Sequence, residues 1–177
     1  MIWYGLLVAA VAAERGAELI VARRNERWST ARGAMVTGQG HYPAMVALHT
    51  GLLIGSPAEV WLADRPFVPA LAWPMLAVLA ASQALRWWCI AALGSRWNTR
   101  VIVVPGLPPV TGGPYRRLRH PNYVAVVAEG MALPLVHTAW ITASVFTVLN
   151  AALLTVRIRC ENRALAAATT PTTPTPA

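Results

Sequence analysis

The stretch AWITASVFTVLNAALLTVRI, residues 139–158, is twenty residues long and carries one charge, on Arg157 near its end. A helix needs about 20 apolar residues to cross the hydrocarbon core of a bilayer. Outward from this run, we expect four more apolar stretches to cross as helices, at residues 2–22, 42–63, 67–93 and 121–137. The last of these is short, so we expect it to cross as one half of a tight hairpin with residues 139–158. The pattern predicts an all-α fold: a multi-pass transmembrane helical bundle of about five spans.

The composition supports a membrane protein. The chain has 177 residues, of which 56% are hydrophobic and only 12% are charged, whereas soluble domains carry about 25% charged residues. All fifteen basic residues are arginine, and the formal net charge is +8. A strongly basic soluble protein would suggest nucleic-acid binding, but here the arginines gather at the ends of apolar runs, where membrane proteins place them. We therefore expect the lipid bilayer as a partner and no nucleic acid.

Arginine is unevenly distributed between the connectors. The segments that follow residues 2–22, 67–93 and 139–158 are rich in arginine, whereas the other two connectors hold only Arg65. Basic loops of membrane proteins remain in the cytoplasm. We therefore expect a cell-membrane protein with its N-terminus outside, its C-terminus in the cytoplasm and its active site facing the cytoplasm.

The chain is expected to form one domain and a tail. Residues 1–166 should make up the transmembrane domain, and residues 167–177, which are rich in threonine and proline, should be a disordered tail. Cys89 and Cys160 have neither CxxC spacing nor a histidine at metal-ligand distance. We therefore expect two free thiols and no metal site.

The connector GGPYRRLRHPNY, residues 112–123, concentrates polar groups between two apolar runs. Pro121 pushes His120 toward extended geometry and suits the first turn of a helix. A helix N-terminus flanked by arginines can bind an anion such as a carboxylate or phosphate. The alternative is a plain positively charged flank with a proline helix start. Tyr123 offers an aromatic face and a hydroxyl one turn into the helix.

A second polar string, RIRCENRAL, covers residues 157–165. Arg157 and Glu161 stand four residues apart, which allows an ion pair on one helical face. Such a pair could be a surface salt bridge worth less than about 1 kcal/mol, or Glu161 could offer its carboxylate to the amine or ribose of a ligand. Because residues 139–158 return beside 121–137, we expect Glu161 to lie close to Arg119 and His120.

These strings resemble the isoprenylcysteine carboxyl methyltransferase family of integral-membrane enzymes. The resemblance is carried by Gly113-Pro114-Tyr115, Arg119-His120-Pro121-Asn122-Tyr123, Gly130 and residues 157–165. It implies S-adenosylmethionine as cofactor, bound between the helical hairpin and the C-terminal helix. The implied cofactor pocket consists of Tyr115, Arg119, His120, Pro121, Tyr123, Arg157 and Glu161. Where the family pattern usually has two adjacent glutamates, this chain has Glu161 followed by Asn162.

A narrower resemblance concerns ARRNERWSTARGAMVTGQGHYPAMVALH and LGSRWNTRVIVVPG. These stretches are similar to a bacterial branch of the family that is found alongside type III polyketide synthases. That branch is associated with O-methylation of alkylpyrones and alkylresorcinols, so it implies a hydrophobic small-molecule acceptor and a type III polyketide synthase as a possible partner. Two alternatives stay open: methylation of an isoprenylcysteine carboxyl or of another lipid, and a non-enzymatic membrane transporter or accessory protein.

The chemistry of the acceptor decides which side chains are needed. A phenol titrates near 10 and would benefit from a general base, whereas a hydroxypyrone is a vinylogous acid that is already ionised and needs little more than a nearby positive charge. The catalytic candidates are His41, Arg157 and Glu161, with His49 and His120 as further possible bases. The candidates for substrate binding are Tyr42, His49, Trp97, Asn98 and Glu129. Intramembrane carboxylates such as Glu14, Glu18 and Glu129 are functional candidates by default, although contacts between helices are the simpler explanation.

Overall fold

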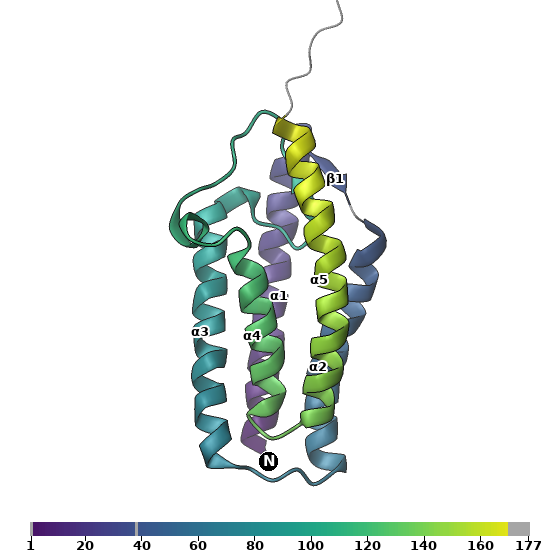
Figure 1. The fold of residues 1–177 in the computed structure, drawn as a ribbon, viewed down its shortest axis with the longest axis vertical. Coiled ribbons are helices and arrows are strands. Elements are labelled where there is room, and N and C mark those ends of the chain that lie inside the picture. The colour runs from purple at the N-terminus through teal and green to yellow at the C-terminus, as the bar shows by residue number, and fades with distance from the viewer. Residues whose placement is uncertain (1, 38, 170–177) are drawn as a thin grey trace, which may run out of the picture.

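The computed structural model describes residues 2–37 and 39–169. Its long elements are the helices α1 (Ile2–Thr30), α2 (Tyr42–Leu62), α3 (Pro69–Leu93), α4 (Pro121–Leu135) and α5 (Trp140–Thr169). The helices run side by side along one long axis (Figure 1). The predicted all-α bundle is confirmed, and each predicted span coincides with a helix. Three short 3-10 turns complete the connectors: η1 (Gln39–His41), η2 (Gly94–Arg96) and η3 (Gly113–Arg116).

A small antiparallel sheet departs from the all-α prediction. Strand β1 (Met35–Thr37) pairs with β2 (Val101–Val103), with Val36 opposite Ile102. β-branched residues favour such a ladder, but three residues paired across a long sequence separation leave no periodic signal in the sequence. The sheet joins the α1–α2 connector to the long connector between α3 and α4, and it packs against α5. It therefore holds both connectors over one end of the bundle.

Three of the helices in the described part of the chain, α2, α3 and α5, are long and apolar enough to cross a membrane by length and composition. Helix α1 is also long, but it carries Glu14, Arg15 and Glu18 near its middle, and α4 has only 15 residues. Large apolar side chains such as Ile54, Leu62 and Val148 lie exposed on the surface of the bundle, as expected where lipid replaces water. A membrane-embedded helical bundle is thus supported, and the count of five spans stays a prediction.

Two helices are longer than their predicted spans. The first continues past residue 22 to Thr30, and the last continues past residue 158 to Thr169. Arginine, glutamate and alanine are good helix formers, so a helix can continue after its apolar run has ended. The predicted tail at 167–177 begins inside α5, and its residues 170–177 lie outside the described residues.

The arginine-rich segments share one end of the molecule. The N-terminus, the α2–α3 connection and the α4–α5 turn lie at one end, while β1, the long α3–α4 connector and the C-terminal end of α5 lie at the other (Figure 1). The three arginine-rich segments belong to this second end. The alternation that the arginine pattern predicted is therefore present in the fold.

Helix α4 packs closely against α5, as the predicted hairpin requires. A Cβ placed on Gly130 would lie 1.9 Å from a ring carbon of Phe146, so only glycine fits at this crossing. The first turn of α5 is capped from another helix, because the Glu59 carboxylate accepts hydrogen bonds from the backbone N–H groups of Ile141 (3.1 Å) and Thr142 (2.7 Å). The first contact fixes α5 beside α4, and the second ties the start of α5 to α2.

Candidate functional site

The start of α4 is set by Pro121, which occupies the first turn and is fully buried. Tyr123 follows one turn in, and its hydroxyl joins two residues of α5. The hydroxyl accepts a hydrogen bond from Arg157 Nε at 2.9 Å and donates one to Glu161 Oε2. The His120 ring stacks on the Tyr123 ring with centroids 5.4 Å apart, and its Nδ1 lies 3.8 Å from Glu161 Oε1. Arginine, phenol, carboxylate and imidazole thus form one connected group.

This arrangement differs from the direct pair that the spacing allowed. Arg157 and Glu161 are not joined by a direct ion pair among the described side chains, because Arg157 turns toward Tyr123 and the Met45 sulfur, 3.4 Å from its Nη1. Arg119 precedes His120 and is exposed. Its part in cofactor binding stays a prediction.

One cavity, which we call the loop-side cavity, lies between the long connector and the ends of α4 and α5. Its volume is about 100 Å³. Five of the residues implied as cofactor ligands line it: Tyr115, His120, Tyr123, Arg157 and Glu161. Pro121 lies behind this wall at the start of α4, and Arg119 does not contribute to it. Asn162, which stands where the family pattern has a second glutamate, is exposed and does not line it either.

Tyr115 reaches the loop-side cavity from the turn η3. Gly113 begins this turn with φ +58°, and a Cβ there would lie 3.2 Å from the Trp88 indole nitrogen, so the Gly-Pro-Tyr sequence lets the connector approach α3 closely. Burial raises the pKa of Tyr115 above its ordinary value. Its hydroxyl is therefore protonated at neutral pH and can donate a hydrogen bond to a ligand.

A second cavity, the span-side cavity, extends down between α1, α2 and α4 and has a volume of about 200 Å³. Most of its wall is apolar, and the predicted substrate residues Tyr42, His49, Trp97 and Asn98 also line it. Glu129 does not. Two apolar residues of the wall, Leu19 on α1 and Val46 on α2, are 41% and 47% exposed. The cavity therefore opens sideways between α1 and α2, where a bilayer would lie.

The two cavities share a wall made of Trp97, Asn98, Asn122, Tyr123 and Arg157. Helix α1 holds part of this wall in place: Asn25 Nδ2 donates to the Trp97 carbonyl at 2.8 Å, and Asn98 Nδ2 donates to the Ala22 carbonyl at 3.1 Å. Trp97 Nε1 and Asn122 Oδ1 are buried without a hydrogen-bond partner in the described part of the chain. The shared wall therefore has unmet capacity to bind a ligand, and groups held in the two cavities would meet there.

The candidate bases occupy different places. The Nδ1 atom of His49 lies 2.8 Å from the Met45 carbonyl oxygen, and because a carbonyl can only accept, Nδ1 carries the proton and Nε2 of the neutral ring keeps a free lone pair. The His49 ring packs edge-on against Phe146 at 5.3 Å. His41 lies outside both cavities, in an open groove beside Arg159. Burial, together with the Arg157 charge, lowers the pKa of His41 below its ordinary value.

Two residues at the deep end of the span-side cavity, Arg15 and Arg86, were not among the predicted site residues. Arg15, Glu18 and Arg86 line this end, and Arg86 Nη2 donates to Glu129 Oε2 at 2.7 Å. Arg86 could have been found from the sequence, because it is a charged residue inside an apolar run. A charge in such a place is costly unless it has a partner. Glu129 was predicted to bind substrate; it does not line the cavity itself but pairs with Arg86 and Arg15, which do.

The part of the chain that forms the loop-side cavity matches a known family. Residues 75–167 match the family model described as isoprenylcysteine carboxyl methyltransferase (ICMT) family, and every residue that lines the loop-side cavity lies within this range. The protein YpbQ of Bacillus subtilis (strain 168), described as uncharacterized, is 40% identical over 166 residues, which cover 93% of this chain and 96% of YpbQ. No solved structure matches the chain.

Proposed function

The chain belongs to the isoprenylcysteine carboxyl methyltransferase family, and on that premise we propose that it O-methylates a lipidic polyketide, an alkylpyrone or alkylresorcinol made by a type III polyketide synthase. Family membership implies a membrane methyltransferase that uses S-adenosylmethionine; the proposal adds the acceptor and the site. The observation that carries it is the pair of neighbouring cavities, one polar and one mostly apolar, that share the wall of Tyr123 and Arg157.

The loop-side cavity, with a volume of about 100 Å³, is the proposed site for the methionyl end of the cofactor. The methionyl end of S-adenosylmethionine carries one carboxylate and one ammonium, so its site needs a cation and an anion close together. Arg157 and Glu161 supply this pair on either side of the Tyr123 hydroxyl, and the positive end of the α4 helix dipole favours an anion. Tyr115 and His120 offer further hydrogen bonds. When bound, S-adenosylmethionine supplies an electrophilic methyl group.

The span-side cavity is the proposed acceptor site. Its apolar wall and its opening beside Leu19 and Val46 suit an alkyl chain that enters from the bilayer. At the shared wall, the Arg157 guanidinium would stabilise the oxyanion of a hydroxypyrone, and Trp97 and Asn98 would position the ring. A phenolic acceptor also has to lose a proton, and Nε2 of His49, which lines this cavity, is the proposed base.

The orientation follows from the arginines and from the cofactor. S-adenosylmethionine is soluble and reaches the enzyme from the cytoplasm, and the loop-side cavity lies at the arginine-rich end of the bundle. We therefore place this end in the cytoplasm and the N-terminus outside. The acceptor would enter from the cell membrane, which explains why the methyltransferase has to be membrane-embedded.

An acceptor panel tests the proposal. Purified protein with labelled S-adenosylmethionine should transfer methyl groups to an alkylpyrone or an alkylresorcinol, and more slowly or not at all to a farnesylated cysteine. Methylation of the prenylcysteine alone would replace the proposed acceptor with the one after which the family is named. Failure to bind S-adenosylhomocysteine would contradict the cofactor site and would favour the transporter or accessory-protein alternative.

A further inference from the structure

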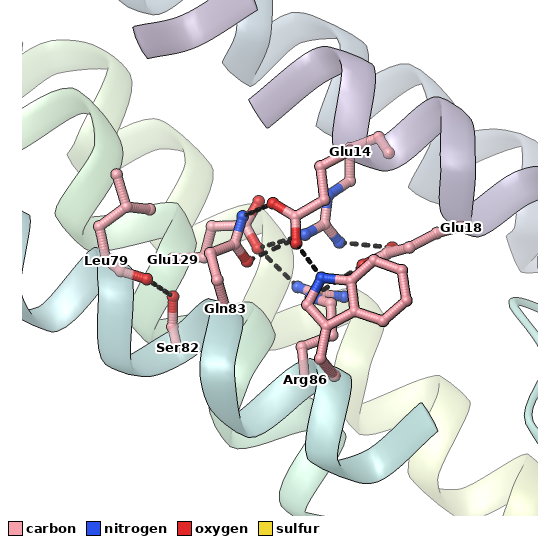
Figure 2. A network of polar contacts seen from close by, with 9 residues as sticks. Glu14, Glu18, Leu79, Ser82, Gln83, Arg86 and Glu129 are labelled. Carbon is pink, nitrogen blue, oxygen red and sulfur yellow. Dashed lines mark hydrogen bonds and ion pairs between the residues drawn. The ribbon is translucent and has the colours of Figure 1, made fainter. Parts of the chain in front are cut away.

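An ionic cluster lies inside the bundle, at the deep end of the span-side cavity (Figure 2). It joins three helices and consists of Glu14, Arg15 and Glu18 from α1, Gln83, Arg86 and Trp87 from α3, and Glu129 from α4. Glu129 Oε2 is shared by Arg86 Nη2 at 2.7 Å and Arg15 Nη2 at 3.1 Å. Arg15 Nη1 also donates to Glu18 Oε2 at 2.7 Å.

A contribution to folding stability does not by itself explain why these charged residues are buried. Glu18, Arg86 and Glu129 are 3%, 5% and 4% exposed, so their charges are withdrawn from solvent. Replacing a buried ion pair by apolar residues is often neutral or stabilising, and ionisable residues inside membrane helices are costly and usually functional. The position of the cluster against a cavity therefore needs an explanation beyond helix packing.

The cluster has hydrogen-bonding capacity that the protein leaves unmet. Arg15 Nε, Arg86 Nε and Glu18 Oε1 form no hydrogen bond with any described residue, and Arg86 Nε stands 3.5 Å from Glu18 Oε1. These three residues are also the cluster members that line the cavity. A hydroxyl can donate to a carboxylate and accept from a guanidinium at the same time, so a hydroxyl is the group that this mixed pair of charges would recognise.

We propose that the Glu18–Arg86 end of the span-side cavity binds a hydroxyl on the head group of the acceptor, separate from the oxygen that receives the methyl group. The inference rests on the proposed function, because it takes the acceptor as the occupant of this cavity. The reacting oxygen lies at the wall shared with the cofactor, near Arg157, and the second oxygen lies at the cluster. The enzyme thereby selects a ring acceptor with two hydroxyls, such as an alkylresorcinol, over an otherwise equal acceptor with one.

Equilibrium binding tests this selection without requiring turnover. The probes are a 5-alkylresorcinol and a 3-alkylphenol with the same chain, titrated into the full-length protein in nanodiscs with S-adenosylhomocysteine present. We expect the resorcinol to bind roughly tenfold more tightly or better, because losing a hydrogen bond to a charged group leaves that group unpaired. Glu18→Gln should reduce this preference to about threefold or less.

Glu14→Gln is the matched control. Glu14 belongs to the same cluster, where it accepts hydrogen bonds from Gln83 and from Trp87 Nε1 (2.5 Å), but it does not line the cavity. This variant removes the same charge from the same helix and should keep the preference for the resorcinol. Equal affinity of the wild type for both probes, binding of neither probe, or an unchanged preference in Glu18→Gln would overturn the proposal.

The two proposals can fail separately. Selective binding of the resorcinol without methyl transfer to any panel member would contradict the proposed reaction and support the hydroxyl site. Transfer to the resorcinol and the phenol with equal affinities for both would support the reaction and contradict the hydroxyl site. The comparison of probes on the wild type needs no variant, so a Glu18→Gln protein that does not fold leaves this test intact.

Discussion

Arg157→Gln is the perturbation that tests the centre of the proposed mechanism. Arg157 is buried on α5, lines both cavities and donates to the Tyr123 hydroxyl at 2.9 Å. The glutamine side chain is shorter than that of arginine, still donates hydrogen bonds and carries no charge. The proposal gives Arg157 two roles, binding the cofactor carboxylate and stabilising the acceptor oxyanion, so both binding and turnover should suffer.

The size of the expected loss in affinity and in turnover follows from the contacts of the Arg157 guanidinium. A hydrogen bond to a charged group contributes about 1.5 to 3 kcal/mol, and about 1.4 kcal/mol corresponds to a factor of ten. Loss of one such contact to the cofactor predicts a dissociation constant for S-adenosylhomocysteine raised about 10- to 100-fold. Loss of the oxyanion contact as well should lower kcat/KM for the acceptor by a further factor of about ten or more.

Two measurements on the same preparation read out the effect. Isothermal titration calorimetry in detergent gives the affinity for S-adenosylhomocysteine, and labelled methyl transfer gives kcat/KM for an alkylresorcinol. Arg159→Gln is the matched control, because Arg159 is two residues away on the same helix, is exposed and lines neither cavity. If Arg157→Gln and Arg159→Gln bind the cofactor product with equal affinity, the assignment of the loop-side cavity is wrong.

Two further predictions concern the packing and the pH dependence. Gly130→Ala should lower the thermal unfolding midpoint in detergent by several degrees, because the added Cβ would overlap the Phe146 ring and overpacking costs about 1 to 3 kcal/mol. Gly51→Ala is the control, because a Cβ there would have no neighbour within 4 Å. This control should leave the midpoint near that of the wild type. The pKa of His41 is lowered by burial and by Arg157, so His41 stays neutral to a lower pH than an ordinary histidine. If His41 is the base, methyl transfer falls off only at a pH below the range of an ordinary histidine, and the acid limb disappears in His41→Gln. An acid limb that persists in this variant excludes His41.

The sequence alone determined the local features of the protein. Apolar runs, the fourth of them shorter than a membrane span, placed the five helices, and Pro121 marked where α4 begins. The arginine pattern indicated which connectors share one end of the bundle. These features are short-range. Apolar runs, proline geometry and charge at helix ends act within one turn or one span, so they can be predicted from the sequence.

The tertiary structure decided which side chains meet. The Tyr123 hydroxyl stands between Arg157 and Glu161 where the sequence suggested a direct pair, because the close crossing of α4 and α5 brings Tyr123 between them. Arg86 lines the span-side cavity and pairs there with Glu18 and Glu129, which come from two other helices. Contacts of this kind depend on the relative rotation and depth of separate helices, which packing of the whole bundle sets and no single stretch of sequence encodes.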